Sequence, residues 1–242
     1  MLAAEFLQAA QPGNRILTKI AMQDEALPLL DCFDLTLRQC RFERVDFSGA
    51  TLAGLHCIQC TFIDCDFTEA DLPEARFEDT CFYRAATQCR FTRANLKLAA
   101  FVQCDLRMCE FERAMLARAE FDEVNAMGAN FHLAQFENAA RIVNSNFRYV
   151  DLTGANLERC VLSYTIFAQA IFQEAHLTGA DLVGASLGGA TWRYAMVTGA
   201  NVRGADISSF DIRTMDLTGV KISERQQRVL LENAGVIIFL DE

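Results

Sequence analysis

A period of five residues runs through most of this 242-residue chain and limits what it can fold into. We place a large residue at positions 37 to 82 in steps of five, at 91 to 136 and at 147 to 222. Of these 36 positions, 28 are Phe or Leu, and together they hold 15 of the 19 Phe. Two residues before each large position, half of the positions hold Ala and seven more hold Cys. Neither a helical period nor strict strand alternation fits, so the chain is a repeat protein.

Strand geometry explains the pattern. In an extended triplet the first and third side chains share one face and the middle one points away, so the small and large residues face inward and the polar residue faces outward. The two residues that follow must turn the chain, which suits Ser, Thr, Gly and Asn. The sequence therefore predicts an all-β rod of stacked coils, about 4.8 Å apart, with only small residues beside each Phe or Leu.

Two register breaks interrupt the period. Phe82 and Phe91 are nine residues apart instead of ten, and Phe136 and Phe147 are eleven apart. At these breaks we expect side chains to leave the smooth wall, although a bulge without function is an equally good interpretation. The candidates for partner contact in the two breaks are Tyr83, Arg84 and Gln88, and Glu137, Arg141 and Ile142.

Residues 1–34 lack the period and are expected to form an N-terminal cap before a β-helix that covers residues 35–222. Leu2, Phe6 and Leu7 share a helical face, and Pro12 followed by Gly13 is expected to end that segment. A partner-binding arm is the alternative for this region.

Residues 223–242 are expected to form a capping and dimerisation module. Ser223 is a candidate helix N-cap, and Gly235 a candidate stop signal. Five consecutive apolar residues follow and predict a short strand, which would promote aggregation if it were left in water. It is expected to cover the last coil or to join a second copy in a symmetric dimer. The candidate dimer contacts are Val229, Leu230, Val236, Ile238, Phe239 and Leu240.

The charge balance argues against direct binding to nucleic acid or to a membrane surface. The chain has 32 acidic and 22 basic residues and so a net charge of −10. Proteins that bind nucleic acid or anionic lipid instead present an excess of Lys and Arg to the negatively charged ligand. No stretch approaches the roughly 20 apolar residues of a membrane span, and the first residues lack the basic region of a signal peptide. We therefore expect the protein in the cytoplasm.

No residue set predicts catalysis, a metal site or a cofactor. The three histidines, His56, His132 and His176, fall at outward or turn positions without an evident cleft. Cys57 and Cys60 have metal-ligand spacing, but both occupy inward positions and are expected to be packing thiols.

Several segments resemble the pentapeptide-repeat family, and among its members the Qnr-type proteins that protect bacterial type II topoisomerases from quinolones. The first is Asp64–Leu72, which is followed by Cys81–Tyr83 at the break; the others are residues 104–106, 208–213, 216–222, 230–232 and 235–236. The resemblance implies a right-handed quadrilateral β-helix of about nine coils and a dimer joined at the C-terminus. It also implies a rod of DNA-like width and charge that binds DNA gyrase or topoisomerase IV.

Acidic residues in the outward column are the candidate contacts with such a partner. They are Asp46, Asp66, Asp71, Asp105, Glu110, Glu120, Asp151, Asp206, Asp211 and Asp216. A net charge of −10 is well below the roughly 26 charges of a duplex as long as the expected rod, so the mimicry would be partial. Both breaks also look shorter than the loops of Qnr proteins. The alternative is another interaction scaffold, such as an immunity factor or a secretion-system accessory, and an enzyme is the least favoured class.

Overall fold

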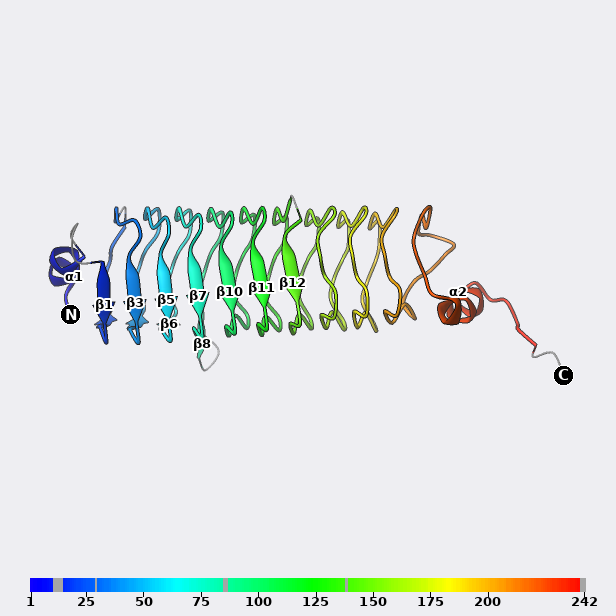
Figure 1. The fold of residues 1–242 in the computed structure, drawn as a ribbon, viewed down its shortest axis with the longest axis horizontal. Coiled ribbons are helices and arrows are strands. Elements are labelled where there is room, and N and C mark those ends of the chain that lie inside the picture. Colours follow the sequence, from blue (N-terminus) through cyan, green and yellow to red (C-terminus); the bar gives the residue numbers. More distant parts are fainter. Residues whose placement is uncertain (11–14, 29, 85–86, 138, 240–242) are drawn as a thin grey trace.

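The computed structural model is a straight rod with a helix at each end (Figure 1). It describes residues 1–10, 15–28, 30–84, 87–137 and 139–239. Helix α1 (Ala3–Ala9) lies at one end, and the 3-10 helix η1 (Glu224–Gln226) and helix α2 (Gln227–Asn233) lie at the other. Across the described residues, no helix is both long enough and apolar enough to cross a membrane.

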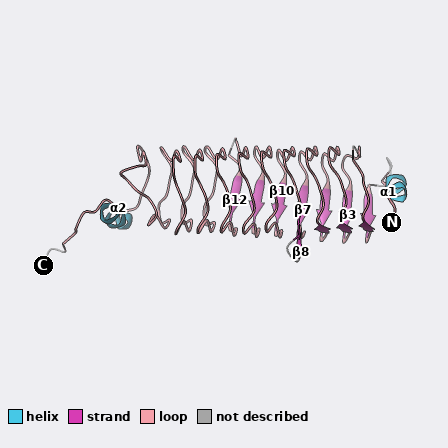
Figure 2. Ribbon diagram, turned by 180° about the vertical axis from the view of Figure 1, so that it is seen from behind, coloured by secondary structure: helices cyan, strands magenta, loops and turns pink. Residues whose placement is uncertain are grey.

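Short parallel strands from successive coils stack along the N-terminal part of the rod, and the later coils are drawn as loops (Figure 2). One sheet contains β1 (Ile16–Thr18), β3 (Thr36–Arg38), β5 (His56–Ile58), β7 (Arg76–Glu78), β10 (Ala100–Val102), β11 (Glu120–Asp122) and β12 (Arg141–Val143). Single bridges continue it through Val161, Asp181, Asn201 and Lys221. A second sheet contains β2 (Ala21–Gln23), β4 (Arg41–Glu43) and β6 (Thr61–Ile63). The predicted quadrilateral β-helix is confirmed.

Phenylalanine rings stacked from coil to coil form the centre of the rod. The Phe111 ring lies 4.9 Å from that of Phe91 and 4.6 Å from that of Phe131, and both pairs are nearly parallel. Phe101 and Phe121, from a neighbouring column, meet Phe111 edge to face. All five rings are fully buried. Because the rings fill the bore, only small residues fit beside them.

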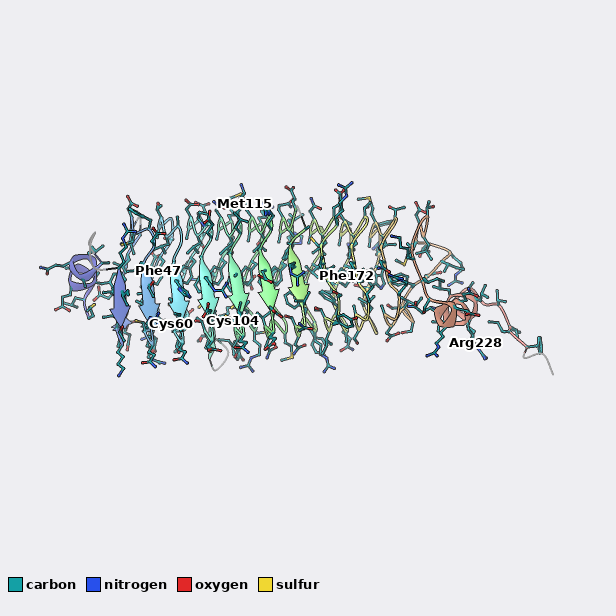
Figure 3. All side chains as sticks on the ribbon, viewed as in Figure 1. Phe47, Cys60, Cys104, Met115, Phe172 and Arg228 are labelled. Atoms are coloured by element: carbon teal, nitrogen blue, oxygen red, sulfur yellow. The ribbon has the colours of Figure 1, made fainter. Side chains whose placement is uncertain are left out.

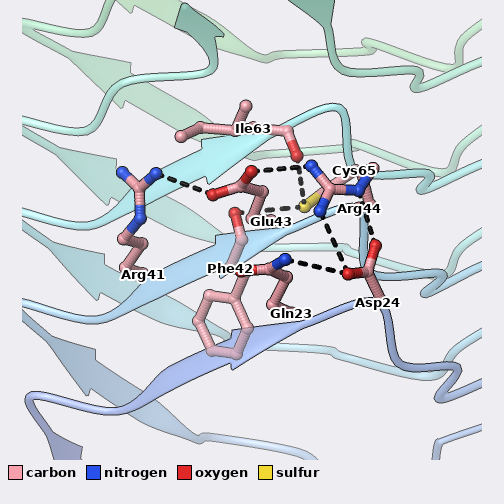
Figure 4. Close-up of polar contacts among 8 residues, drawn as sticks. All are labelled: Gln23, Asp24, Arg41, Phe42, Glu43, Arg44, Ile63 and Cys65. Carbon is pink, nitrogen blue, oxygen red and sulfur yellow. Dashed lines mark hydrogen bonds and ion pairs between the residues drawn. The ribbon is translucent and has the colours of Figure 1, made fainter.

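Cysteines beside the rings also donate hydrogen bonds across the coils, a role that the sequence pattern did not predict. The Cys65 thiol reaches the carbonyl oxygens of Phe42 and Ile63, at 3.5 Å each (Figure 4). Thr165 occupies the same small position and donates to the Ile142 carbonyl oxygen at 2.9 Å. Hydroxyl groups are therefore tolerated in the bore because the preceding coil satisfies them.

The coils begin earlier than the sequence period suggested. β1 and β2 pair with β3 and β4, so residues 15–34 add a coil to the rod instead of belonging to a cap. Leu17, Met22 and Leu27 fill its large positions and are buried. The pattern was hidden because the matching small positions hold residues such as Ile20 and Glu25 in place of Ala or Cys.

Helix α1 caps the first coil. Phe6 is almost fully buried and meets the Phe42 ring edge to face, with 6.0 Å between the ring centroids. Pro12 and Gly13, which were expected to end this segment, lie outside the described residues.

Both register breaks are insertions. The Phe67 ring stacks on the Phe91 ring. Four uninterrupted repeats of five would instead place residue 87 next to Phe67. Four residues are therefore inserted at the first break. They form a hairpin in which β8 (Tyr83–Arg84) pairs antiparallel with β9 (Thr87–Gln88). At the second break Glu120 pairs with Arg141, so only one residue is added. The expectation of a one-residue loss at the first break is therefore corrected.

The C-terminal end departs from the predicted strand. Phe210 and Met215 occupy small positions in the last coil, where earlier coils have Ala. After helix α2 the described residues Val236–Phe239 form no strand, and the chain leaves the rod as a tail (Figure 1). Since a strand needs a partner edge, the expected strand is not formed by these residues in the single chain, and pairing with a second copy stays a prediction.

We predict that Phe111→Ala lowers the free energy of unfolding by about 3–5 kcal/mol, because rings above and below prevent collapse into the void. Chemical denaturation of the purified variant measures the change. Tyr149→Ala is the matched control, since Tyr149 is 56% exposed, and it should change stability by less than about 0.5 kcal/mol. An unchanged midpoint for Phe111→Ala would contradict the packed bore.

Buried thiols predict a loss of stability in alkali. Burial raises the pKa of the Cys104 and Cys160 thiols from 9.0 to about 12. The unfolded chain therefore releases these protons first, and the contribution to stability is intact below pH 9 and is lost as the pH rises toward 12. Over this range the two thiols together should lower the free energy of unfolding by at most about 2.7 kcal/mol per pH unit. Denaturation curves of a Cys104→Ala/Cys160→Ala variant should lack this slope, and an equal slope would exclude the effect.

Candidate partner-binding site

The β8–β9 hairpin leaves the wall of the rod (Figure 1). Two backbone pairings define it, Tyr83 with Gln88 and Arg84 with Thr87. The side chain of Arg84 lies outside the described part of the structure. The hairpin stands at the edge between two faces of the rod, one of which carries Asp105 and the other Glu110.

The following coil contacts both strands of the hairpin. The Arg107 guanidinium carbon lies 4.5 Å from the centre of the Tyr83 ring, and two hydrogen bonds from Arg107 to the Asp105 carboxylate, 2.8 and 2.6 Å long, hold it there. On the other strand, the Gln88 amide donates to a Glu110 carboxylate oxygen at 3.0 Å. The structure therefore brings four predicted site residues together at the hairpin base.

One face of the rod beside the hairpin holds a column of mostly acidic residues, which we call the acidic face. Successive bridges align its members in the order Asp46, Asp66, Arg90, Glu110, Asn130 and Asp151. Arg90 pairs with Asp66 at 3.0 Å. Partial burial raises the pKa of Asp66, but hydrogen bonds from Thr68 and Arg90 outweigh burial and lower it overall. The Asp66 carboxylate is therefore ionised at neutral pH.

Most of the predicted aspartates also stabilise their own turn. One carboxylate oxygen accepts a hydrogen bond from the backbone N–H group two residues later, as Asp46 does from Ser48 at 2.8 Å. The same bond is made by Asp66, Asp105, Asp151, Asp206, Asp211 and Asp216. This use follows from the turn preference of Asp, so an acidic column alone does not identify a binding surface.

The other predicted residues lie away from the hairpin. Asp71, Asp206, Asp216 and Glu120 occupy columns other than the acidic face, and Asp211 lies in the last coil, paired with Arg213. The second break is at the opposite edge of the rod from β8 (Figure 1). There the Glu137 carboxylate accepts a hydrogen bond from Asn156 at 3.4 Å, and Arg141 pairs with Glu120.

Ile142 needs a correction. It is completely buried and aligns with Phe121 in the core sheet, so its side chain cannot contact a partner. The eleven-residue break consists of one repeat of six residues and one of five, and Ile142 is the large residue between them.

The sequence indicated Arg41 and Arg90 as basic residues among the outward acids, but it did not indicate Arg44 or the ion pairs that neutralise part of the acidic surface. Arg44 bridges Asp24 and Glu43, with donor–acceptor distances of 2.5 to 3.0 Å, and Arg41 pairs with Glu43 at 2.7 Å (Figure 4). Asp24 and Arg44 are separated by one full coil. A search for opposite charges at that spacing would have found this pair.

The C-terminal candidates divide into two groups. Val229 and Leu230 are half-buried and pack against the core, so they cap the last coil. Val236 is 46% exposed and Phe239 83%, while Ile238 is half-buried. Leu240 lies outside the described residues. Ile237, which was not among the candidates, is 78% exposed.

Between the last two coils the rod is open on one side. The backbone N–H groups of Phe172 and Leu177 donate hydrogen bonds to the next coil. Trp192 and Val197 are the equivalent residues one coil later, and within the described residues their N–H groups make no such bond. A cavity of about 490 Å³ lies at the gap, lined by residues that include Trp192 and Met215. Figure 3 shows the labelled Phe47 and Phe172 among the side chains along the rod.

Comparison with known proteins places the chain in a family. The family described as "Pentapeptide repeats" matches in eight copies, over residues 54–85, 104–139, 140–179 and 170–208. The chain belongs to the pentapeptide-repeat family.

The similar proteins named in the comparison include several Qnr proteins. The quinolone resistance pentapeptide repeat protein QnrB96 of Scandinavium goeteborgense is 34% identical over 137 residues, which are 53% of this chain and 56% of that protein. QnrB4 of Escherichia coli is 34% identical over 131 residues, 50% of this chain and 60% of QnrB4. The matched segments thus span less than two thirds of these curated relatives.

Structural similarity extends further. The full-length structure of QnrB1, a plasmid-mediated fluoroquinolone resistance protein, matches with a TM-score of 0.72 and 28% identity. The match covers 91% of this chain and 100% of QnrB1.

Proposed function

We propose that this chain is a non-catalytic rod that binds a type II topoisomerase, DNA gyrase or topoisomerase IV, in the cytoplasm and protects it from quinolones or a related poison. The observation that carries the proposal is the match to the whole length of QnrB1, a fluoroquinolone resistance protein. The filled bore supports a function on the outer surface, because buried rings occupy the interior of the described coils.

The acidic face supports a partial mimicry of DNA. From Asp46 to Asp151 it passes through five steps between coils, or about 24 Å, with four carboxylates and one arginine. A duplex of that length carries about 14 phosphate charges. Recognition must therefore depend on local charge and shape, and the hairpin beside the face supplies a shape that a smooth rod lacks.

The alternative scaffold function has lost part of its basis. Residues 1–34 were the feature expected to distinguish it, as a partner-binding arm, whereas β1 and β2 in this region pair with the next coil and Phe6 in α1 packs on Phe42.

We predict that the purified protein restores DNA supercoiling by gyrase in the presence of a fluoroquinolone. The assay compares supercoiling with and without drug over a range of protein concentrations. No rescue at stoichiometric excess, with either gyrase or topoisomerase IV, would overturn the proposed function.

The contribution of the acidic face has a matched control. Asp151 on that face and Asp181 on another face make the same turn bond, to Thr153 and Val183. Asp151→Asn and Asp46→Asn should each weaken topoisomerase binding about two- to fivefold at low salt, whereas Asp181→Asn should not. Equal effects on the two faces would contradict a role for the acidic face.

We further propose that the chain is a homodimer joined at the C-terminus. The exposed apolar tail and the open ladder beside Trp192 lie at the same end of the rod, and both lack a partner within the described chain.

Phe239→Asp should convert a dimer, with twice the 27.0 kDa mass of one chain, to a monomer, because a charge in an apolar contact is costly. Light scattering after size exclusion measures the mass. Leu7→Asp, at the opposite end and 47% exposed, is the control and should remain dimeric. A monomeric parent protein would refute the proposed dimer.

A further inference from the structure

The β8–β9 hairpin is too short to hold its own orientation. It contains two residue pairs, and isolated two-stranded hairpins are at best marginally stable in water. Contacts with the rest of the rod must therefore fix the orientation of the hairpin. The following coil supplies two such contacts, one for each strand.

The first contact holds strand β8. Arg107 stacks on the Tyr83 ring, and its guanidinium is oriented by two hydrogen bonds to Asp105. The same local pair occurs between Arg213 and Asp211, at 2.9 and 3.3 Å, without an aromatic ring over the arginine among the described residues. The Asp105–Arg107 pair is therefore an ordinary turn feature of this rod that is used here to hold a tyrosine.

The second contact holds strand β9. One Glu110 carboxylate oxygen accepts the Gln88 amide at 3.0 Å, and the other accepts the Asn130 amide of the next coil at 2.7 Å. Glu110 is thus fixed from below while it holds Gln88. Bonds to an ionised acceptor are stronger than those between neutral groups.

We propose that Arg107 and Glu110 are positioning residues, a two-point latch that fixes the direction of the β8–β9 hairpin for partner binding. Asp105 and Glu110, which the sequence indicated as contacts with the partner, then act through the hairpin. The value of the latch for binding rests on the proposed function, whereas the latch itself is tested without a topoisomerase.

The experiment measures tryptic cleavage after Arg84 in the folded protein by mass spectrometry. When opening is fast relative to cleavage, the rate reports the population of released hairpin. Arg107→Gln should speed cleavage about two- to fivefold, the range expected for an exposed cation–π contact. Glu110→Ala should have a similar effect, and the double variant should be faster than either, since each residue holds a different strand.

A double-variant cycle separates the latch from a general loosening. Tyr83→Ala should speed cleavage as much as Arg107→Gln does. The variant that combines the two substitutions should be cleaved no faster than either single variant, because both substitutions remove the same contact. Tyr83→Phe keeps the ring and should behave like the parent. The thermal midpoint should stay constant, and Arg213→Gln, the matched control, should leave cleavage after Arg84 unchanged. The latch is refuted by an unchanged rate in Arg107→Gln and Glu110→Ala, or by additive effects of Tyr83→Ala and Arg107→Gln.

Topoisomerase protection gives the second readout. If the latch selects the binding orientation, the concentration of protein needed for half-maximal rescue should rise in inverse proportion to the latched fraction, so the rise is largest in the double variant. Unchanged rescue by the double variant, once its cleavage rate shows that most of the hairpin is released, would refute the role in partner binding. If the parent protein gives no rescue, the proposed function fails, and the cleavage rates alone decide whether the latch exists.

Discussion

Every coil of this rod depends on the stacking of an inward Phe or Leu on the equivalent residue of the next coil. A single coil cannot bury these residues alone, so stability accumulates through contacts between neighbours. The rings fill the bore, which leaves the corners and outer faces as the places where the sequence can vary. The first insertion shows this freedom: four added residues leave the rod as a hairpin, and Phe67 still stacks on Phe91 at 4.9 Å.

The period identified the fold because inward positions accept few residue types. The period did not reveal repeats whose inward positions hold other residue types. The coil at residues 15–34 was hidden by Ile20 and Glu25 at small positions, although Leu17 and Met22 are buried as large residues. The strand expected near Val236 is absent from the single chain, since a run of apolar residues shows a tendency to pair but does not supply the edge to pair with.

The candidate site was predictable in its residue types but not in its arrangement. The nine residues from Phe82 to Phe91 can be two repeats of five with one residue lost, or one repeat of five with four residues inserted. A count in steps of five cannot distinguish these two possibilities. The choice changes which residues are neighbours, because an outward residue aligns with the one a full coil away. With four inserted residues Asp66 aligns with Arg90, and Gln88 comes within 3.0 Å of Glu110. The sequence showed which side chains face outward, and the insertion decides which of four faces they share.

The repeat itself favours Asp at outward positions, because the carboxylate accepts a backbone N–H group from its own turn. The number of acids therefore overstates the charge available to a partner. On the acidic face Arg90 neutralises Asp66, and Glu110 is engaged by Gln88 and Asn130. Among the described residues no ion pair opposes Asp46 or Asp151, whose second carboxylate oxygens remain free for a partner. These two lie toward opposite ends of the face, with the hairpin between them along the rod. The carboxylates without an ion pair thus lie on both sides of the hairpin along the rod, which is the arrangement that the proposed contact with a partner requires.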